Sequence, residues 1–140
     1  MELKSQHSDK IDSDILVIPV QIQSANKILR QHWAVRSRAK KEYALFIRNQ
    51  MKLKNVKKAE CKKYKIKIIS YRARKLDYDN LVLGCKGLVD AMIDENLIWD
   101  DSPDYVDVTY EQVTGQLSEN YDKKITRYLK TLTVIVRENI

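Results

Sequence analysis

Two pairs of carboxylates are the residues of this chain best suited to chemistry. Asp77 and Asp79 lie in the string DYDNL, and Asp100 and Asp101 lie in the string WDDS. Neighbouring carboxylates repel one another and raise each other's pKa, so a cluster of them commonly implies a bound cation. Carboxylate oxygens are hard ligands that favour Mg²⁺, Mn²⁺ or Ca²⁺. If the two pairs meet in space, they predict a divalent metal site.

The segment between the two pairs contains polar residues that could join such a site. Lys86 follows Asp79 by seven residues in the sequence, close to two helical turns, and Asp90 follows one turn later. These three side chains could form one polar seam along a helix. Plainer roles stay open: Asp79 or Asn80 caps the helix, Lys86 and Asp90 form a surface ion pair, and residues 100–103 form only a turn.

The charges divide the chain into a basic part and an acidic part within a net charge of +7. Residues 27–75 contain 18 Lys and Arg against two Glu, whereas residues 76–122 contain 12 Asp and Glu against Lys86 alone. A basic surface suits DNA, because each neutralised phosphate releases counterions. A solvated basic surface without a partner stays open. The candidate DNA-binding residues are Arg38, Lys41, Arg48, Lys63, Lys65, Lys67, Arg72, Arg74 and Lys75.

Composition narrows the class of protein. The two cysteines, Cys61 and Cys85, form no CxxC pair, so neither a disulfide framework nor a structural zinc site is expected. Residues 1–13 are polar and lack the apolar core of a signal peptide, and no apolar run approaches the roughly 20 residues of a membrane helix. We expect a cytoplasmic protein without membrane contact. The three glycines form no phosphate-binding loop, and no small-molecule substrate is expected.

Hydrophobic periodicity predicts the elements that position these residues. A chain of 140 residues is large enough for one core, and we expect a flexible tail at 1–13 and a single domain at 14–140. Strands are predicted at 15–20, 64–68, 106–110 and 132–136, and helices at 38–54 and 80–93, with irregular connections at 23–36 and 115–124. The order β-α-β-α-β-β predicts an α/β sandwich of the α+β type, a mixed sheet with two helices packed on it.

The acids before the second helix should be positioned by an extended segment. If residues 75–79 are extended, Asp77 and Asp79 point the same way, because side chains alternate along a strand. Asp79 then stands at the start of helix 80–93, and Asp101 follows its far end. We therefore expect acids from opposite ends of a single helix to converge on one cation.

Three motifs that follow one another along the chain resemble those of the RusA family of Holliday junction resolvases. They are Asp77 to Asn80, then Lys86 with Asp90, then Asp100 with Asp101. The resemblance covers most of residues 15–136, including Pro19 and Ser24-x-Asn26, but its specific part is 77–102. It implies a small dimeric endodeoxyribonuclease, dependent on Mg²⁺ with Mn²⁺ as a substitute, that cuts four-way DNA junctions. The residues that match are the metal-binding acids Asp77, Asp79 and Asp101, the further acids Asp100 and Asp90, and the catalytic lysine Lys86.

One departure from the family concerns Lys86, because some members carry the lysine four residues after the second aspartate rather than seven. The three extra residues amount to nearly one helical turn, so the lysine keeps roughly the same face. The implied chemistry is phosphodiester hydrolysis by a metal-activated water, with a twofold dimer making paired symmetric nicks. The resemblance also associates the chain with a phage or prophage. Two alternatives stay open: a non-catalytic nucleic-acid-binding protein, and a flap or general branched-DNA nuclease.

Overall fold

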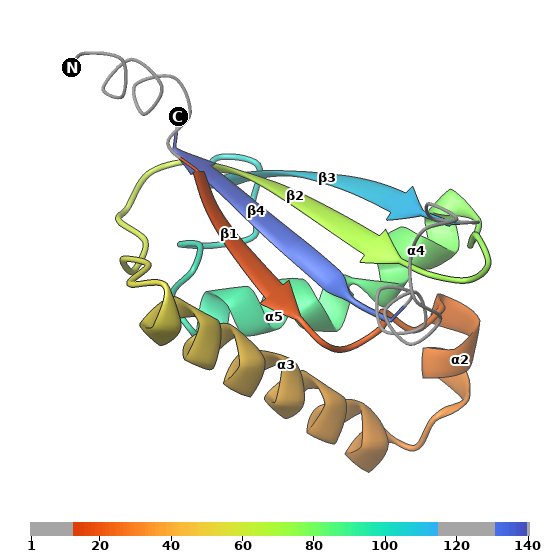
Figure 1. Ribbon diagram of the computed structural model, residues 1–140. Coiled ribbons are helices and arrows are strands. Elements are labelled where there is room, and N and C mark those ends of the chain that lie inside the picture. Colours follow the sequence, from red (N-terminus) through yellow and green to blue (C-terminus); the bar gives the residue numbers. More distant parts are fainter. Residues whose placement is uncertain (1–12, 115–130, 140) are drawn as a thin grey trace.

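The computed structural model describes residues 13–114 and 131–139, which form a four-stranded mixed sheet with helices packed on one face (Figure 1). The predicted tail and the predicted connection 115–124 lie outside these residues, except that Ser13 already belongs to the first strand. The strands are β1 (Ser13–Ile18), β2 (Tyr64–Tyr71), β3 (Val106–Val113) and β4 (Thr133–Asn139). The helices are α2 (Ala25–Arg30), α3 (Trp33–Leu53), α4 (Tyr78–Gly84) and α5 (Lys86–Asp94).

The sheet has the strand order β1-β4-β2-β3. β4 is antiparallel to both of its neighbours, and β2 and β3 are parallel, with Tyr64 opposite Val106 and Tyr71 opposite Val113. The predicted class and element order are confirmed. β1 is an edge strand and ends before Pro19, so the missing N–H of that proline removes no bond from the β1–β4 ladder.

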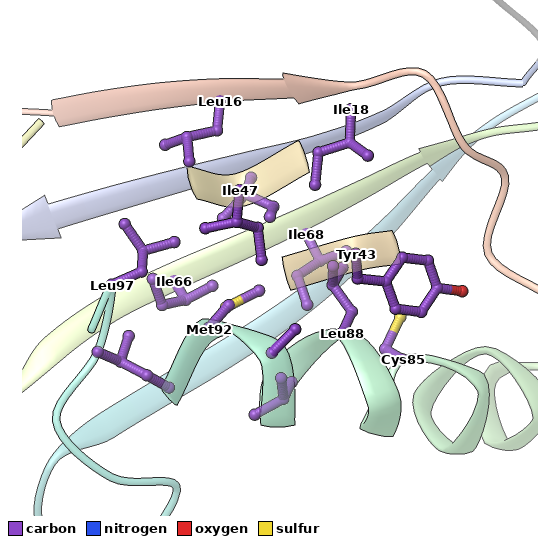
Figure 2. Close-up of a cluster of buried hydrophobic side chains, with 14 of the residues drawn as sticks. Leu16, Ile18, Tyr43, Ile47, Ile66, Ile68, Cys85, Leu88, Met92 and Leu97 are labelled. Carbon is purple, nitrogen blue, oxygen red and sulfur yellow. The ribbon is translucent and has the colours of Figure 1, made fainter. Parts of the chain in front are cut away.

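The core lies between the sheet and the pair α3 and α5 (Figure 2). Alternate residues of β2 are buried, as the period of a strand facing one layer of helices requires. Ile66 and Ile68 of this strand are fully buried with Ile47 of α3 and with Leu88 and Met92 of α5. Each such side chain stabilises the fold by about 1.5–3 kcal/mol through removal of apolar surface from water. Among the described residues, no helix has the length and apolar character needed to cross a bilayer.

The segment that precedes the long helix is more helical than predicted. Residues 25–30 form α2, and α3 begins at Trp33 rather than near residue 38. The reason is capping: Ser24 Oγ accepts a hydrogen bond from Lys27 N at 3.2 Å, and His32 Nδ1 accepts one from Ala34 N at 3.1 Å. Each cap satisfies a backbone N–H that a helix start would otherwise leave without a partner.

The predicted helix 80–93 is two helices, and the extended segment before it is shorter than predicted. α4 begins at Tyr78, and the chain changes direction between α4 and α5 at Cys85. A close approach accompanies this junction, because a Cβ on Gly84 would lie 2.1 Å from the carbonyl oxygen of Gln23. The break thus seats α4 directly on the chain that leads into α2. The expectation that Asp79 continues a strand is therefore wrong, since it lies in the first turn of α4.

Candidate metal and nucleic-acid sites

Asp77 and Asp79, here called the α4 acids, lie at the start of α4. Asp77 is the N-cap residue, but its side chain makes no capping bond. Both side chains are exposed, and no described cation pairs with either of them. Their position is set by Leu76, whose N–H donates to Gln112 Oε1 at 2.8 Å and whose carbonyl accepts from Gln112 Nε2 at 2.9 Å. These two hydrogen bonds between the Leu76 backbone and the Gln112 side chain hold the α4 acids beside the carboxyl end of β3.

Asp100 and Asp101, here called the turn acids, lie in the turn between α5 and β3. Their turn is anchored on its first side by the buried Leu97, whose carbonyl accepts from Arg137 Nη1 of β4 at 3.0 Å. It is anchored on its second side by Tyr105, whose carbonyl accepts from Tyr64 N at 3.0 Å. Asp101 is exposed and Asp100 is partly buried. The predicted turn is therefore present, and it lies beside the amino ends of β2 and β3.

The two pairs of acids do not meet within one chain. Figure 1 shows α4 beside the arrowheads of β2 and β3, whereas the connection after α5 lies beside their opposite ends. Gln112, which holds the α4 acids, is six residues along β3 from Val106, a length of roughly 20 Å in an extended strand. In the described part of the chain, no three Asp, Glu, His or Cys residues are grouped so that they could hold a metal.

The separation follows from topology and corrects the expectation of convergence. Two adjacent parallel strands need a crossover, which carries the chain from the end of one strand back to the beginning of the next. Residues just after β2 and residues just before β3 must then lie at opposite ends of the sheet. The described residues of a single chain therefore do not fit a Mg²⁺ ion shared by Asp77, Asp79 and Asp101.

Lys86 and Asp90 lie together, but on a different surface from the turn acids. Lys86 is the first residue of α5 and is exposed, and Asp90 lies one turn later. The Asp90 carboxylate lies 3.8 Å from Lys40 Nζ of α3, so its ion-pair partner is in another helix. Both side chains are partly exposed, at 45% for Lys40 and 32% for Asp90, and the pair contributes little to stability.

Three of the candidate DNA-binding cations are engaged within the fold. Arg48 donates two hydrogen bonds to Glu95, at 3.0 and 2.9 Å, and this pairing lowers the pKa of Glu95. Lys67 Nζ lies 3.2 Å from a Glu111 carboxylate oxygen. Arg72 is only 8% exposed and donates to the carbonyls of Ile22 and Arg74. We therefore remove Arg72 from the DNA-binding candidates.

The remaining cations lie on more than one face of the molecule. Arg38 and Lys41 belong to α3, in the helical layer, whereas Lys65 alternates with buried residues and faces the open side of the sheet. On that side Lys65 lies opposite Asp107 of β3 and Glu138 of β4, so its charge is balanced locally. The predicted single basic surface is thus divided. The exposed candidates are Arg38, Lys41, Lys63, Lys65, Arg74 and Lys75.

A groove of about 510 Å³ was not foreseen from the sequence. It lies between α2, α3 and the α4–α5 junction, and its charged residues are Arg36, Lys40, Lys86 and Asp90. Trp33 also lines it and is 67% exposed. The signal that could have revealed it is the capping chemistry of Ser24 and His32, which turns an apparently irregular basic connection into two helices.

Two comparisons with known proteins were negative. Neither a scan against family models nor a search of curated proteins produced a match. The resemblance to the RusA family accordingly rests on the residues of the three motifs, Asp77 to Asn80, Lys86 to Asp90, and Asp100 with Asp101.

Proposed function

We propose that the protein is a Mg²⁺-dependent endodeoxyribonuclease that works as a homodimer on branched DNA. Its preferred substrate in this proposal is the four-way junction, which it resolves by paired symmetric nicks. The observation that carries the proposal is the state of the acids: Asp77, Asp79 and Asp101 are all exposed, without a described ion-pair partner. A basic protein that leaves these carboxylates unpaired at ordered positions favours an external cation as their partner.

Dimerisation supplies what a single chain lacks. If the turn acids of one subunit approach the α4 acids of its partner, twofold symmetry requires the reciprocal approach as well. Such a dimer has two equivalent sets of carboxylates, each assembled from two chains. Carboxylate oxygens suit Mg²⁺, with Mn²⁺ as a substitute. Two symmetric sites also suit a substrate in which two opposing strands must be cut.

Exposed cations near the α4 acids support a role for this end of the molecule in binding DNA. Arg74 and Lys75 are exposed and immediately precede the segment that carries Asp77. Lys86 is exposed at the start of α5, where it could neutralise charge on a bound phosphate. Phosphate contacts of this kind position the backbone without reading its sequence. The proposal places the protein in the bacterial cytoplasm, with a phage or prophage origin following from the resemblance alone.

A non-catalytic DNA-binding protein is the second candidate, and one observation favours it. The described residues of one chain provide no group of acids that could hold a metal. A protein that binds DNA through α3 and the segment before α4 would need no such group. A flap or general branched-DNA nuclease would use the same residues as the main proposal and differ only in substrate.

The proposal is tested with purified protein and labelled four-way junction, flap and plain duplex, each with Mg²⁺, with Mn²⁺ or with chelator. We expect paired nicks in opposing junction strands that require metal and that are lost in Asp79→Asn while junction binding is retained. Binding without cleavage in either metal would support the non-catalytic candidate. Equal cleavage of flaps and junctions would support the general nuclease.

A further inference from the structure

The groove between α2, α3 and the α4–α5 junction has the size of a small-ligand site. Its volume of about 510 Å³ lies within the usual range for pockets that bury a small molecule. Its walls come from separate helices, and Gly84 allows α4 to lie directly against the chain that leads into α2. α4 rests on the Gln23 carbonyl at Gly84, and the ring of Tyr43 lies beside Gly87. The groove is therefore framed by packed helices.

The charge of the groove favours an anion. Arg36, Lys40 and Lys86 line it, against the single carboxylate of Asp90. That carboxylate lies 3.8 Å from Lys40 Nζ, which leaves Arg36 and Lys86 as cations with no described ion-pair partner. Guanidinium and ammonium groups side by side are the usual protein partners of a phosphate.

The apolar residues of the groove favour a flat, partly apolar group next to that anion. Leu29, Trp33 and Leu83 line it and are exposed by 73%, 67% and 58%. Three large apolar side chains around one concave site are unusual on a solvated surface. An aromatic ring among cations is also the common platform for nucleic-acid bases, since every base offers a π-face for stacking.

One unpaired acceptor adds a requirement for a hydrogen-bond donor. Gln31 lines the groove, and its Nε2 donates to Gln23 Oε1 at 3.0 Å. Its own Oε1 is shielded from solvent and has no hydrogen-bond partner among the described residues. A shielded acceptor without a donor is costly. An exocyclic amino or ring N–H group of a base could satisfy this oxygen if the Gln31 side chain turns towards the groove on binding.

We propose that the groove binds a single unpaired nucleotide of branched DNA, with the base against Trp33 and the phosphate on Arg36 and Lys86. This inference rests on the proposed function only in taking DNA as the substrate. It adds a recognition element for an unpaired base, which a flap offers, which a four-way junction offers where a base pair at its centre opens, and which intact duplex lacks. Because Leu83 lies in α4, one turn after Asp79, and Lys86 begins α5, a nucleotide held here keeps its strand close to Asp79.

The test measures base-dependent binding without metal, so that cleavage plays no part. In a Trp99→Phe background, Trp33 is the only tryptophan and reports directly on stacking. The protein is titrated in chelator with a ten-nucleotide oligodeoxyadenylate and with an abasic oligonucleotide of equal length and charge. We expect quenching of Trp33 fluorescence by the first probe and binding about 5- to 150-fold tighter than to the second.

Matched variants locate the binding in the groove. Trp33→Ala should bind both probes equally, whereas Trp33→Phe should keep part of the preference for bases; circular dichroism checks that both fold. Arg36→Gln should weaken binding of both probes more than Arg38→Gln does. Both substitutions remove one positive charge from α3, but only Arg36 lines the groove. Lys52→Gln, on the far part of α3, serves as the remote control.

Equal binding of both probes with unchanged Trp33 fluorescence would overturn the inference. A dimer that becomes monomeric in Leu83→Asp, with no preference for bases in the parent, would overturn it in favour of a subunit interface. The proposed function fails separately. Metal-dependent junction nicking without base preference removes only the groove proposal, and base preference without nicking removes only the nuclease.

Discussion

The two ends of the parallel pair β2–β3 carry acids of the same kind in different surroundings. At the carboxyl end, the α4 acids are held by hydrogen bonds between Leu76 and Gln112 and lie near a basic groove. At the amino end, the turn acids are fastened by Leu97 and Tyr105 to strands in the middle of the sheet. Both ends are fixed by hydrogen bonds, but the two pairs of acids lie too far apart within the described residues of one chain to share a cation.

This contrast teaches that order in the sequence is not order in space. Three motifs that follow one another along some twenty-five residues are read as one site, but a crossover between parallel strands distributes them over both ends of the sheet. A function that needs both pairs of acids therefore needs two chains. Mixing of variant subunits tests this conclusion, and substitutions of single residues test the packing and hydrogen bonds at each end of β2 and β3.

The largest expected effect comes from mixing two inactive variants. Asp79→Asn and Asp101→Asn should each reduce junction nicking by about 100-fold or more, because each removes a charged ligand from both composite sites. Mixed and re-equilibrated, they should regain activity, since one of the two sites in each heterodimer is then intact. The recovered rate should reach about a quarter of wild type, seen as single rather than paired nicks.

The control is a mixture of Asp77→Asn with Asp79→Asn, which alter the same pair of acids and should not complement. Recovery in this control, or none in the first mixture despite confirmed subunit exchange, would contradict a site built from two chains.

The second prediction concerns the seat of α4. Gly84→Ala should lower the free energy of unfolding by about 1–3 kcal/mol or more, because the added Cβ would meet the Gln23 carbonyl at 2.1 Å and backbone must move. Gly87→Ala is the matched control, since its Cβ would lie 3.7 Å from the Tyr43 ring, an ordinary contact. Urea denaturation measures both. Equal stabilities of the two variants would show that α4 does not rest on this carbonyl.

The third prediction separates structural from DNA-binding arginines at the same end. Arg72→Ala should destabilise the fold by about 1–3 kcal/mol, because it leaves the buried carbonyl of Ile22 without its 2.6 Å donor. Arg74→Ala should leave stability nearly unchanged and reduce the salt dependence of DNA binding, since its side chain is exposed. Denaturation curves and salt titrations on the same samples distinguish the two roles. The reverse pattern would restore Arg72 to the DNA surface.

The smallest effect concerns one thiol at each end. Cys61 is exposed, whereas burial raises the pKa of Cys85 to about 12. At pH 8 a thiol reagent should therefore modify one cysteine in the native protein and two in denaturant. The folded-state pKa of Cys85 lies above its unfolded value of 9.0, so its contribution to stability is full below pH 9 and is lost as pH rises towards 12. Cys85→Ala should flatten this alkaline loss, and rapid modification of both native thiols would contradict the burial.

The sequence predicted the type of secondary structure correctly where a segment shows a single hydrophobic period. Ile66 and Ile68 alternate with lysines and form a strand as expected, and Tyr43, Ile47 and Met51 face the core from one helix. The pattern failed at Cys85, because Leu81, Leu88 and Met92 keep a helical spacing across a break and are buried on both sides of it. A hydrophobic period cannot report a change of helix direction when both halves pack on the same core.

The site was less predictable than the fold, for two physical reasons. Where Asp77 and Asp101 lie relative to each other depends on the crossover, which no local pattern encodes. The groove depends on caps by Ser24 and His32, which act through single hydrogen bonds rather than through a repeated pattern. Asp77, Asp79 and Asp101 are exposed, whereas Asp90 and Asp100 are partly buried, and a cation shared by the acids stays a prediction.

The hydrogen bond from Arg137 to the carbonyl of Leu97 has a consequence for the order in which the protein folds. It joins residues forty positions apart, and Arg137 also lies 5.0 Å from the Tyr64 ring and bonds Asp14 of β1 at 2.8 Å. A nascent chain that has emerged from the ribosome only as far as β3 holds the turn without this fastening. Contacts that distant in sequence form late in folding, so the turn acids reach their fixed position only once β4 has paired with the sheet.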